Sequence, residues 1–111
     1  MRFDALELAI QLIRNLRPLV ERLRTRNADA ARQIRRAADS VPSNLAEGGK
    51  RLGRDRIHHF SVAAGSAEEV RTALRVAVAW GDITGDLSEA EVCGALEILD
   101  RIIANCWRLT H

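Results

Sequence analysis

Seven basic residues around one unusual segment are the strongest candidates for chemistry in this sequence. The segment is SVPSNLAEGG, residues 40–49, and the basic residues on its two sides are Arg32, Arg35, Arg36, Lys50, Arg51, Arg54 and Arg56. A guanidinium group stays ionised and donates two parallel hydrogen bonds, which suits the oxygens of a phosphate. The cluster therefore predicts contact with a phosphate backbone. The alternative is a solvated surface on which Asp39, Glu47 and Asp55 pair with these cations.

Arg54 and His59 raise a second, catalytic possibility. Their spacing matches the R-x4-H pattern of HEPN-type ribonucleases, in which the motif lies on a helix and is paired across a dimer. This resemblance implies metal-independent RNA cleavage, with His59 in proton transfer as the ribose 2′-OH attacks and Arg54 steadying the phosphate. The pattern is short and the chain is rich in arginine, so a chance match is easy. The ribonuclease is therefore kept as an alternative.

Metal and cofactor sites are not indicated by the sequence. Asp55 and His58 stand three residues apart, but a di-iron bundle needs two such motifs, and no second copy exists. No zinc spacing, phosphate-binding loop, dinucleotide fingerprint or serine elbow is present. Glu68 and Glu69 are expected to pair with neighbours on their own helix, namely Arg71, Thr72 or Arg75. We therefore expect no cofactor, no metal and no catalytic residue.

Four amphipathic segments must position these residues. In each, apolar residues recur in steps of three and four, which marks one buried helical face, and no segment alternates as a strand does. The apolar positions are Leu6, Ala9, Ile13, Leu16, Val20 and Leu23; Ile34, Ala38, Val41, Leu45 and Gly48; Phe60, Ala63, Ala67, Val70, Leu74, Ala77 and Gly81; Val92, Ala95, Leu99, Ile102, Cys106 and Leu109. The pattern predicts an all-α fold with helices over about 4–25, 29–48, 54–82 and 88–110. Short connections favour an antiparallel up-down-up-down four-helix bundle in a single domain, 1–111.

Polar residues and glycines mark the predicted helix boundaries. Asn27 and Asp29 are candidate N-caps of the second helix, and Ser88 with Glu91 has capping-box spacing for the fourth. Three glycines in GGKRLGR, residues 48–54, predict a loop whose backbone N–H groups could face an anion.

Pro42 interrupts the second predicted helix. Proline removes one helical hydrogen bond and crowds the preceding turn, at a cost of roughly 3 kcal/mol unless the freed groups are satisfied. The polar residues that can satisfy them are Asp39, Ser40, Ser43 and Asn44. We expect a kink at Pro42, a restarted turn capped by Asn44 with Glu47, and an end at Gly48 or Gly49 in left-handed geometry. Pro18 is expected to kink the first helix in the same way.

Gly65 and Ser66 lie in a run of small residues on the third predicted helix. Small side chains let another helix approach closely, and the expected partner is the part of the second helix around Pro42, with Ser66, Ser43 or Asn44 bonded to backbone there. We therefore predict that SVPSN and the Gly65-Ser66 pair are two halves of one packing site.

With the helices in place, two motifs resemble a known family. QIRRAA is followed by SVPSNLAEG, residues 40–48, and HHFSVAAGSAEEVRTAL adds Phe60 and a Gly65-Ser66-x-x-Glu69 pattern. Together they resemble the four-helix-bundle family of large-subunit ribosomal RNA intervening-sequence proteins over about residues 33–74. The structural motif residues on this resemblance are Pro42, Ser43, Asn44, Glu47, Gly48, Gly65, Ser66 and Glu69.

The resemblance implies a homopentamer of bundles with no established enzymatic activity. A related branch is the accessory variability determinant of diversity-generating retroelements, a basic pentamer that binds nucleic acid and a reverse transcriptase. The resemblance therefore implies an RNA-associated binding role. This chain departs from that branch in one respect, because its net charge is only +2.

Charge and apolar residues are distributed unevenly. Residues 1–60 carry a net charge of +6 and residues 61–111 a net charge of −4, which hints at an anionic partner for the first part. The third and fourth helices also carry apolar residues beside their main faces: Val76, Trp80, Leu96, Ile103 and Trp107. An apolar arc wider than one seam favours a homo-oligomer over a merely thick core.

The remaining features point to the cytoplasm. Cys93 and Cys106 lie 13 residues apart on one predicted helix, about 20 Å, so they cannot bridge within the chain and are expected as small core residues. The first segment is an amphipathic helix rather than a signal peptide, and no apolar run approaches the roughly 20 residues of a membrane span.

The sequence therefore predicts a non-enzymatic, homo-oligomeric binding module, expected as a pentamer, that associates with ribosomal or other structured RNA, or a ribonucleoprotein, through its basic surface. Membranes are not expected as partners. One alternative is a protein-binding scaffold without nucleic-acid binding, and the other is the HEPN-like ribonuclease.

Overall fold

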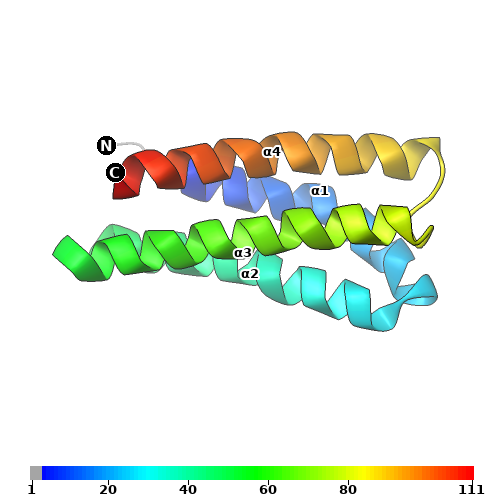
Figure 1. Cartoon of the computed structure of the whole chain (residues 1–111), viewed down its shortest axis with the longest axis horizontal. Helices are drawn as coiled ribbons and strands as arrows, with labels where there is room; N and C mark the ends of the chain where they lie inside the picture. Colours follow the sequence, from blue (N-terminus) through cyan, green and yellow to red (C-terminus); the bar gives the residue numbers. More distant parts are fainter. Residues whose placement is uncertain (1–3) are drawn as a thin grey trace.

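Helices account for nearly all of the protein. The computed structural model describes residues 4–111, and in this range the chain forms four α-helices and no strand. They are α1 (Asp4–Arg26), α2 (Ala28–Lys50), α3 (Gly53–Ala79) and α4 (Asp86–Thr110). The all-α, four-helix prediction is confirmed, while the first three residues of the predicted domain lie outside the described residues. Figure 1 shows the start of α1 and the end of α4 at the same end of the elongated molecule. The up-down-up-down order of the helices stays a prediction.

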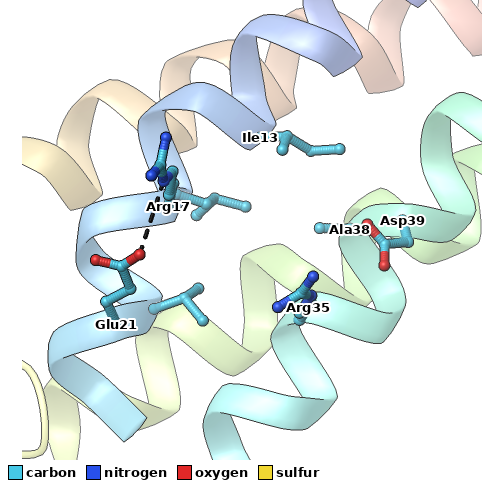
Figure 2. A pocket seen from close by; sticks show the side chains of 8 residues that line it. Ile13, Arg17, Glu21, Arg35, Ala38 and Asp39 are labelled. Atoms are coloured by element: carbon cyan, nitrogen blue, oxygen red, sulfur yellow. Dashed lines mark ion pairs between the residues drawn. The ribbon is translucent and has the colours of Figure 1, made fainter.

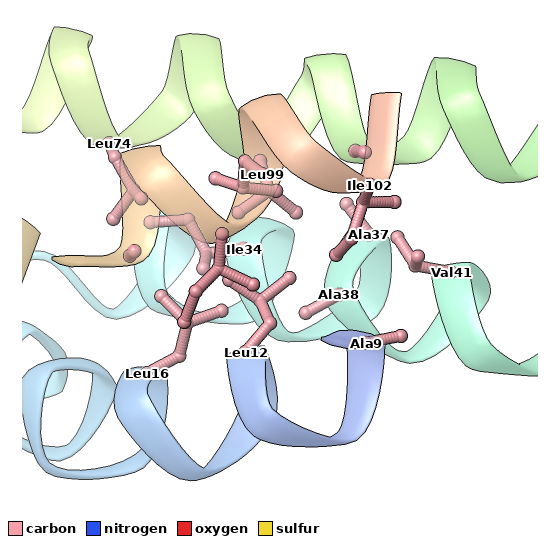
Figure 3. Close-up of a cluster of buried hydrophobic side chains, with 14 of the residues drawn as sticks. Ala9, Leu12, Leu16, Ile34, Ala37, Ala38, Val41, Leu74, Leu99 and Ile102 are labelled. Atoms are coloured by element: carbon pink, nitrogen blue, oxygen red, sulfur yellow. The ribbon is translucent and has the colours of Figure 1, made fainter. Parts of the chain in front are cut away.

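Each helix packs against two neighbours around a shared aliphatic core. α1 contacts α2 and α4, and α3 contacts the same two helices. Figure 3 shows side chains from all four helices meeting at the centre, among them Leu12, Ile34, Leu74 and Leu99. The apolar faces predicted for the last three helices are buried, apart from Gly81 and Leu109, which are partly buried. Burial of these faces drives the helices together, because each carries an apolar stripe that water disfavours.

The buried face of α1 is displaced from the predicted one. The buried positions are Ala5, Leu8, Ala9, Leu12, Leu16, Leu19 and Leu23. The predicted Leu6, Ile13 and Val20 are only partly buried and pack against the edge of the core. Both sets have helical spacing, because α1 has an apolar arc wider than one seam, so periodicity alone could not select between them.

α2 continues through Pro42 without a break and ends later than expected. Asn27 is its N-cap, as predicted, and its side chain accepts a hydrogen bond from the Ala30 N–H at 3.0 Å. The expected end at Gly48 or Gly49 is wrong, because both glycines are helical and α2 ends at Lys50. The Arg51 N–H then donates to the Gly48 carbonyl from an extended backbone, so no left-handed cap is needed. Kinks at Pro42 and Pro18 stay predictions.

Two further boundary predictions are wrong. The connection between α2 and α3 is only Arg51 and Leu52 rather than a glycine-rich loop, and the left-handed residue there is Gly53, with φ +61°. The capping box at Ser88 does not form, because α4 already begins at Asp86 after Gly85, whose φ is +95°. A glycine reaches this φ at little cost, and it starts the helix earlier than a serine cap would.

Candidate nucleic-acid interface

The arginine group on α2 points outward. Ile34, Ala37 and Ala38 are buried, so the intervening Arg35 and Arg36 lie on the exposed side of the helix. Arg32 is also exposed and pairs with Asp29 one turn earlier. Within residues 4–111, neither Arg35 nor Arg36 forms an ion pair. These two guanidinium groups are therefore available to an anion.

The second basic group lies at the α2–α3 connection, where local pairing occupies part of it. Arg51 lies 3.3 Å from a Glu47 oxygen and 3.5 Å from an Asp55 oxygen. The Arg56 guanidinium carbon lies 5.2 Å from the centre of the Phe60 ring. Lys50 and Arg54 are exposed, and no ion pair to either occurs in the described part of the chain. The expectation of local pairing thus holds for part of the cluster and not for the rest.

The basic residues form two patches rather than one surface. Arg36 and Lys50 are separated by 14 residues of one helix, which is about 21 Å along the axis. Residues 36, 43 and 50 recur in steps of two helical turns, so the two patches lie on the same side of α2. Carboxylates at Asp39 and Glu47 lie between them. A partner with charges at separated points along a strand suits this spacing better than one small anion.

The two motifs around Pro42 and Gly65 meet between α2 and α3 in a chain of hydrogen bonds. The Ser66 hydroxyl donates to the Ser40 hydroxyl at 2.8 Å, and the Asn44 amide Nδ2 donates to the Ser40 carbonyl at 2.9 Å. His59 Nδ1 lies 3.0 Å from Asn44 Oδ1, which must accept the hydrogen bond, so Nδ1 carries the proton. Ser66 thus meets the segment around Pro42 as expected, but it bonds to the Ser40 hydroxyl rather than to backbone. Asn44 does bond to backbone, at the Ser40 carbonyl, and does not cap a restarted turn, because α2 is continuous.

Gly65 does not take part in this packing, which corrects the expectation that it lets α2 approach. It is exposed, and a Cβ built on it meets nothing within 4 Å. The close approach is at Gly48 instead, where a Cβ would lie 2.6 Å from the buried ring of Phe60. A signal for this contact was present, since Gly48 continues the buried spacing of Val41 and Leu45, where a larger apolar residue would otherwise stand.

The pairing expected for Glu68 and Glu69 is also wrong. Arg71 donates to Asp100 of α4 at 3.0 Å rather than to a neighbour on α3. Neither glutamate has an ion pair within the described residues. The reason is position: Arg71 faces the packed neighbour α4, whereas both glutamates are exposed.

The ribonuclease residues are not brought together within one chain. Arg54 and His59 are five residues apart on α3, which places them about 140° apart around the helix. His59 is directed toward α2, where Nδ1 bonds Asn44 and Nε2 lies 3.8 Å from Asp55. His59 is thus already engaged in packing, and Arg54 is exposed on another side.

No other chemistry is assembled in the described part of the chain. Residues 4–111 contain no group of three or more His, Cys, Asp and Glu side chains placed to hold a metal.

Burial raises the pKa of the Cys106 thiol to about 11, so it stays protonated at neutral pH. Cys93 is exposed, which corrects its expected core position. Among the described helices, none combines the length and apolarity that crossing a membrane demands.

A shallow groove of about 260 Å³ separates α1 from the arginine side of α2. Figure 2 shows Arg17 and Glu21 on the α1 rim and Arg35 and Asp39 on the α2 rim. The Arg17 and Glu21 side chains pair across one turn at 3.7 Å. Arg35 also lines a hollow on the outer side of α2 together with Arg32 and Arg36. It differs from these two arginines in that it borders the groove with the apolar floor as well.

Comparison with known families gives one match. The family described as 23S rRNA-intervening sequence protein matches residues 2–103. No curated protein and no solved structure matches the chain.

Proposed function

The chain belongs to the 23S rRNA-intervening sequence protein family, and on this premise we propose that it is a non-enzymatic, homo-oligomeric module that binds RNA or a ribonucleoprotein. The observation that carries the proposal is the outward side of α2. Arg36 near the middle of α2 and Lys50 at its end are exposed and have no ion pair within the described residues. Basic groups held about 20 Å apart on a rigid helix suit phosphates that lie several nucleotides apart in a structured RNA.

Self-association supports this role because one chain is only weakly basic. A ring of several copies would repeat the α2 patches and convert modest contacts into multivalent binding. Exposed apolar side chains are what an interface between copies would cover. They include Trp80 at 79% exposed, Leu87 at 68%, Trp107 at 60% and Val76 at 48%. We propose a pentamer, in line with the family resemblance, acting in the cytoplasm, where the unpaired Cys93 and Cys106 stay reduced.

The test is a gel-shift titration of the protein with ribosomal RNA fragments, in EDTA, across a salt series. We expect a slowed, uncut RNA band whose affinity falls steeply as salt rises, because binding releases counterions from phosphates. Arg36→Glu/Lys50→Glu should weaken binding and reduce the steepness of the salt dependence by about one unit for each phosphate that the variant no longer neutralises. The matched control is Arg14→Glu/Arg101→Glu, which makes the same charge change at exposed positions on α1 and α4.

Two other outcomes have defined meanings. Absence of any shift at low salt would contradict RNA binding and favour the protein scaffold, in which the basic patches meet an acidic protein. Cleaved RNA would favour the ribonuclease, provided that His59→Ala abolishes the cleavage and leaves the oligomer intact.

A further inference from the structure

The groove between α1 and α2, defined by the residues shown in Figure 2, has the character of a helix-docking surface. Its floor is apolar, formed by Ile13, Leu16, Val20 and Ala38. Its two rims carry charges of both signs, Arg17 and Glu21 on α1 and Arg35 and Asp39 on α2. Within residues 4–111, Arg35 and Asp39 have no ion pair, although they stand beside an apolar surface where a partner of opposite charge would be stabilised.

A second surface of the same chain has matching properties. The outer face of α3 is directed away from its neighbours and consists of Gly65, Glu68, Glu69, Thr72, Arg75 and Val76. A Cβ at Gly65 would meet nothing within 4 Å, and Val76 is 48% exposed beside a shallow hollow with Thr72 and Arg75. Glu68, Glu69 and Arg75 have no ion pair among the described residues. This face has a glycine at one end, an exposed valine at the other, and unpaired charges of both signs between them.

We propose that the outer face of α3 of one copy docks into the α1–α2 groove of a neighbouring copy. The inference rests on the proposed homo-oligomer and names two surfaces that contribute to it; of the exposed apolar residues named above, Val76 belongs to this contact. Glu68 and Glu69 would lie opposite Arg35, and Arg75 opposite Asp39, so that the unpaired charges of each surface meet the opposite sign. Gly65 to Val76 spans about 16 Å and Ile13 to Val20 about 10 Å, so the α3 face is the longer surface. Its charged part, Glu68 to Arg75, spans about 10 Å and matches the groove in length.

The docking joins two different surfaces, and this has a structural consequence. A contact between unlike faces leaves one face free on each end of a pair, so further copies add until a ring closes. The docking also assigns different roles to the arginines of α2, one in the contact between copies and the others in RNA binding. Arg35 belongs to the contact between copies, while Arg32, Arg36, Lys50 and Arg54 remain for RNA.

The test uses two variants of the full chain and measures mass by light scattering after size-exclusion chromatography. Gly65→Leu places bulk on the outer α3 face without an intrachain clash, and Arg17→Glu/Arg35→Glu makes the groove rim acidic. Each variant alone is expected to be a folded monomer by circular dichroism. Mixed in equal amounts, they are expected to form a one-to-one dimer, because each retains the surface that the other has lost. The controls Ala90→Leu and Arg14→Glu/Arg101→Glu, at exposed positions outside both surfaces, should keep the wild-type mass.

The remaining outcomes overturn the inference in distinguishable ways. A monomeric wild-type protein contradicts the homo-oligomer, and the docking with it. A wild-type oligomer that survives either variant contradicts the docking alone and leaves the proposed function standing. Two monomeric variants that do not combine when mixed contradict the docking of the outer α3 face into the groove, because one intact copy of each surface is then present and no contact forms.

Discussion

The two flanks of α2 differ in how completely the chain closes them. On the α3 flank, the ring of Phe60 lies against Gly48, and hydrogen bonds connect Ser66 through Ser40 and Asn44 to His59. On the α1 flank, a groove with an apolar floor and charged rims stays open (Figure 2). We call the α3 side of α2 the sealed flank, because side chains of α2 and α3 fill it. We call the α1 side the open flank, because a groove remains there. The difference indicates that contacts on the α2–α3 flank stabilise the fold, while the α1–α2 flank keeps an open groove, which is the surface that we propose for assembly.

The largest expected effect is at the closest approach on the sealed flank. Gly48→Leu should lower the free energy of unfolding by roughly 3 kcal/mol, because the added atoms overlap the buried Phe60 ring. The measurement is urea denaturation followed by circular dichroism. The control is the same substitution at Gly65, which is expected to raise subunit stability by up to about 1 kcal/mol, because leucine favours helix and nothing lies in its way. Equal effects at the two glycines would remove the contrast between the flanks.

A smaller loss is expected from the hydrogen-bond chain on the same flank. Asn44→Ala removes the acceptor of His59 Nδ1 and the donor to the Ser40 carbonyl. Since both partners are partly buried, the free energy of unfolding should fall by roughly 1–2 kcal/mol. Chemical denaturation of the double variant Asn44→Ala/His59→Ala checks the coupling. Strictly additive losses would mean that the two side chains do not act through their shared bond.

The smallest effect is expected on the open flank. Arg17→Ala breaks the exposed ion pair with Glu21 at the groove rim, and the subunit should lose no more than about 0.5 kcal/mol. A loss above about 1 kcal/mol in the same denaturation measurement, made at a protein concentration at which both proteins are monomeric, would show that the groove rim stabilises the fold itself. In that case the α1–α2 flank would not be a surface kept for assembly.

Much of the fold could be predicted because helical periodicity is a local property. The apolar faces of the last three helices and the Asn27 cap were recognisable from residue spacing alone. Helix ends were less predictable, since Gly48 and Gly49 remain helical although they carry a typical termination signal. Whether a glycine ends a helix depends on whether the next turn can pack, and here Gly48 lies against Phe60.

The candidate site was predictable in residue type but not in arrangement. Arginine is suited to phosphate wherever it is exposed, so the seven basic residues could be named from chemistry alone. The sequence named Asp39, Glu47 and Asp55 as pairing partners but not which cations they engage. In the structure Glu47 and Asp55 lie near Arg51, whereas Arg36 and Lys50 stay unpaired in the described chain. Arg35 was indistinguishable from Arg36 in the sequence, and only the packing of α1 against α2 places it at the groove.

The sequence by itself determined that this chain forms four amphipathic helices around an aliphatic core, because residue spacing and hydrophobic burial act along each segment separately. It also determined where positive charge is concentrated. Only the tertiary structure decided that Gly48 rather than Gly65 permits the close approach, that α1 buries Leu8, Leu12 and Leu19, and that one flank of α2 stays open. These features depend on which side of one helix meets another, and that rotation is set by the joint packing of all four helices.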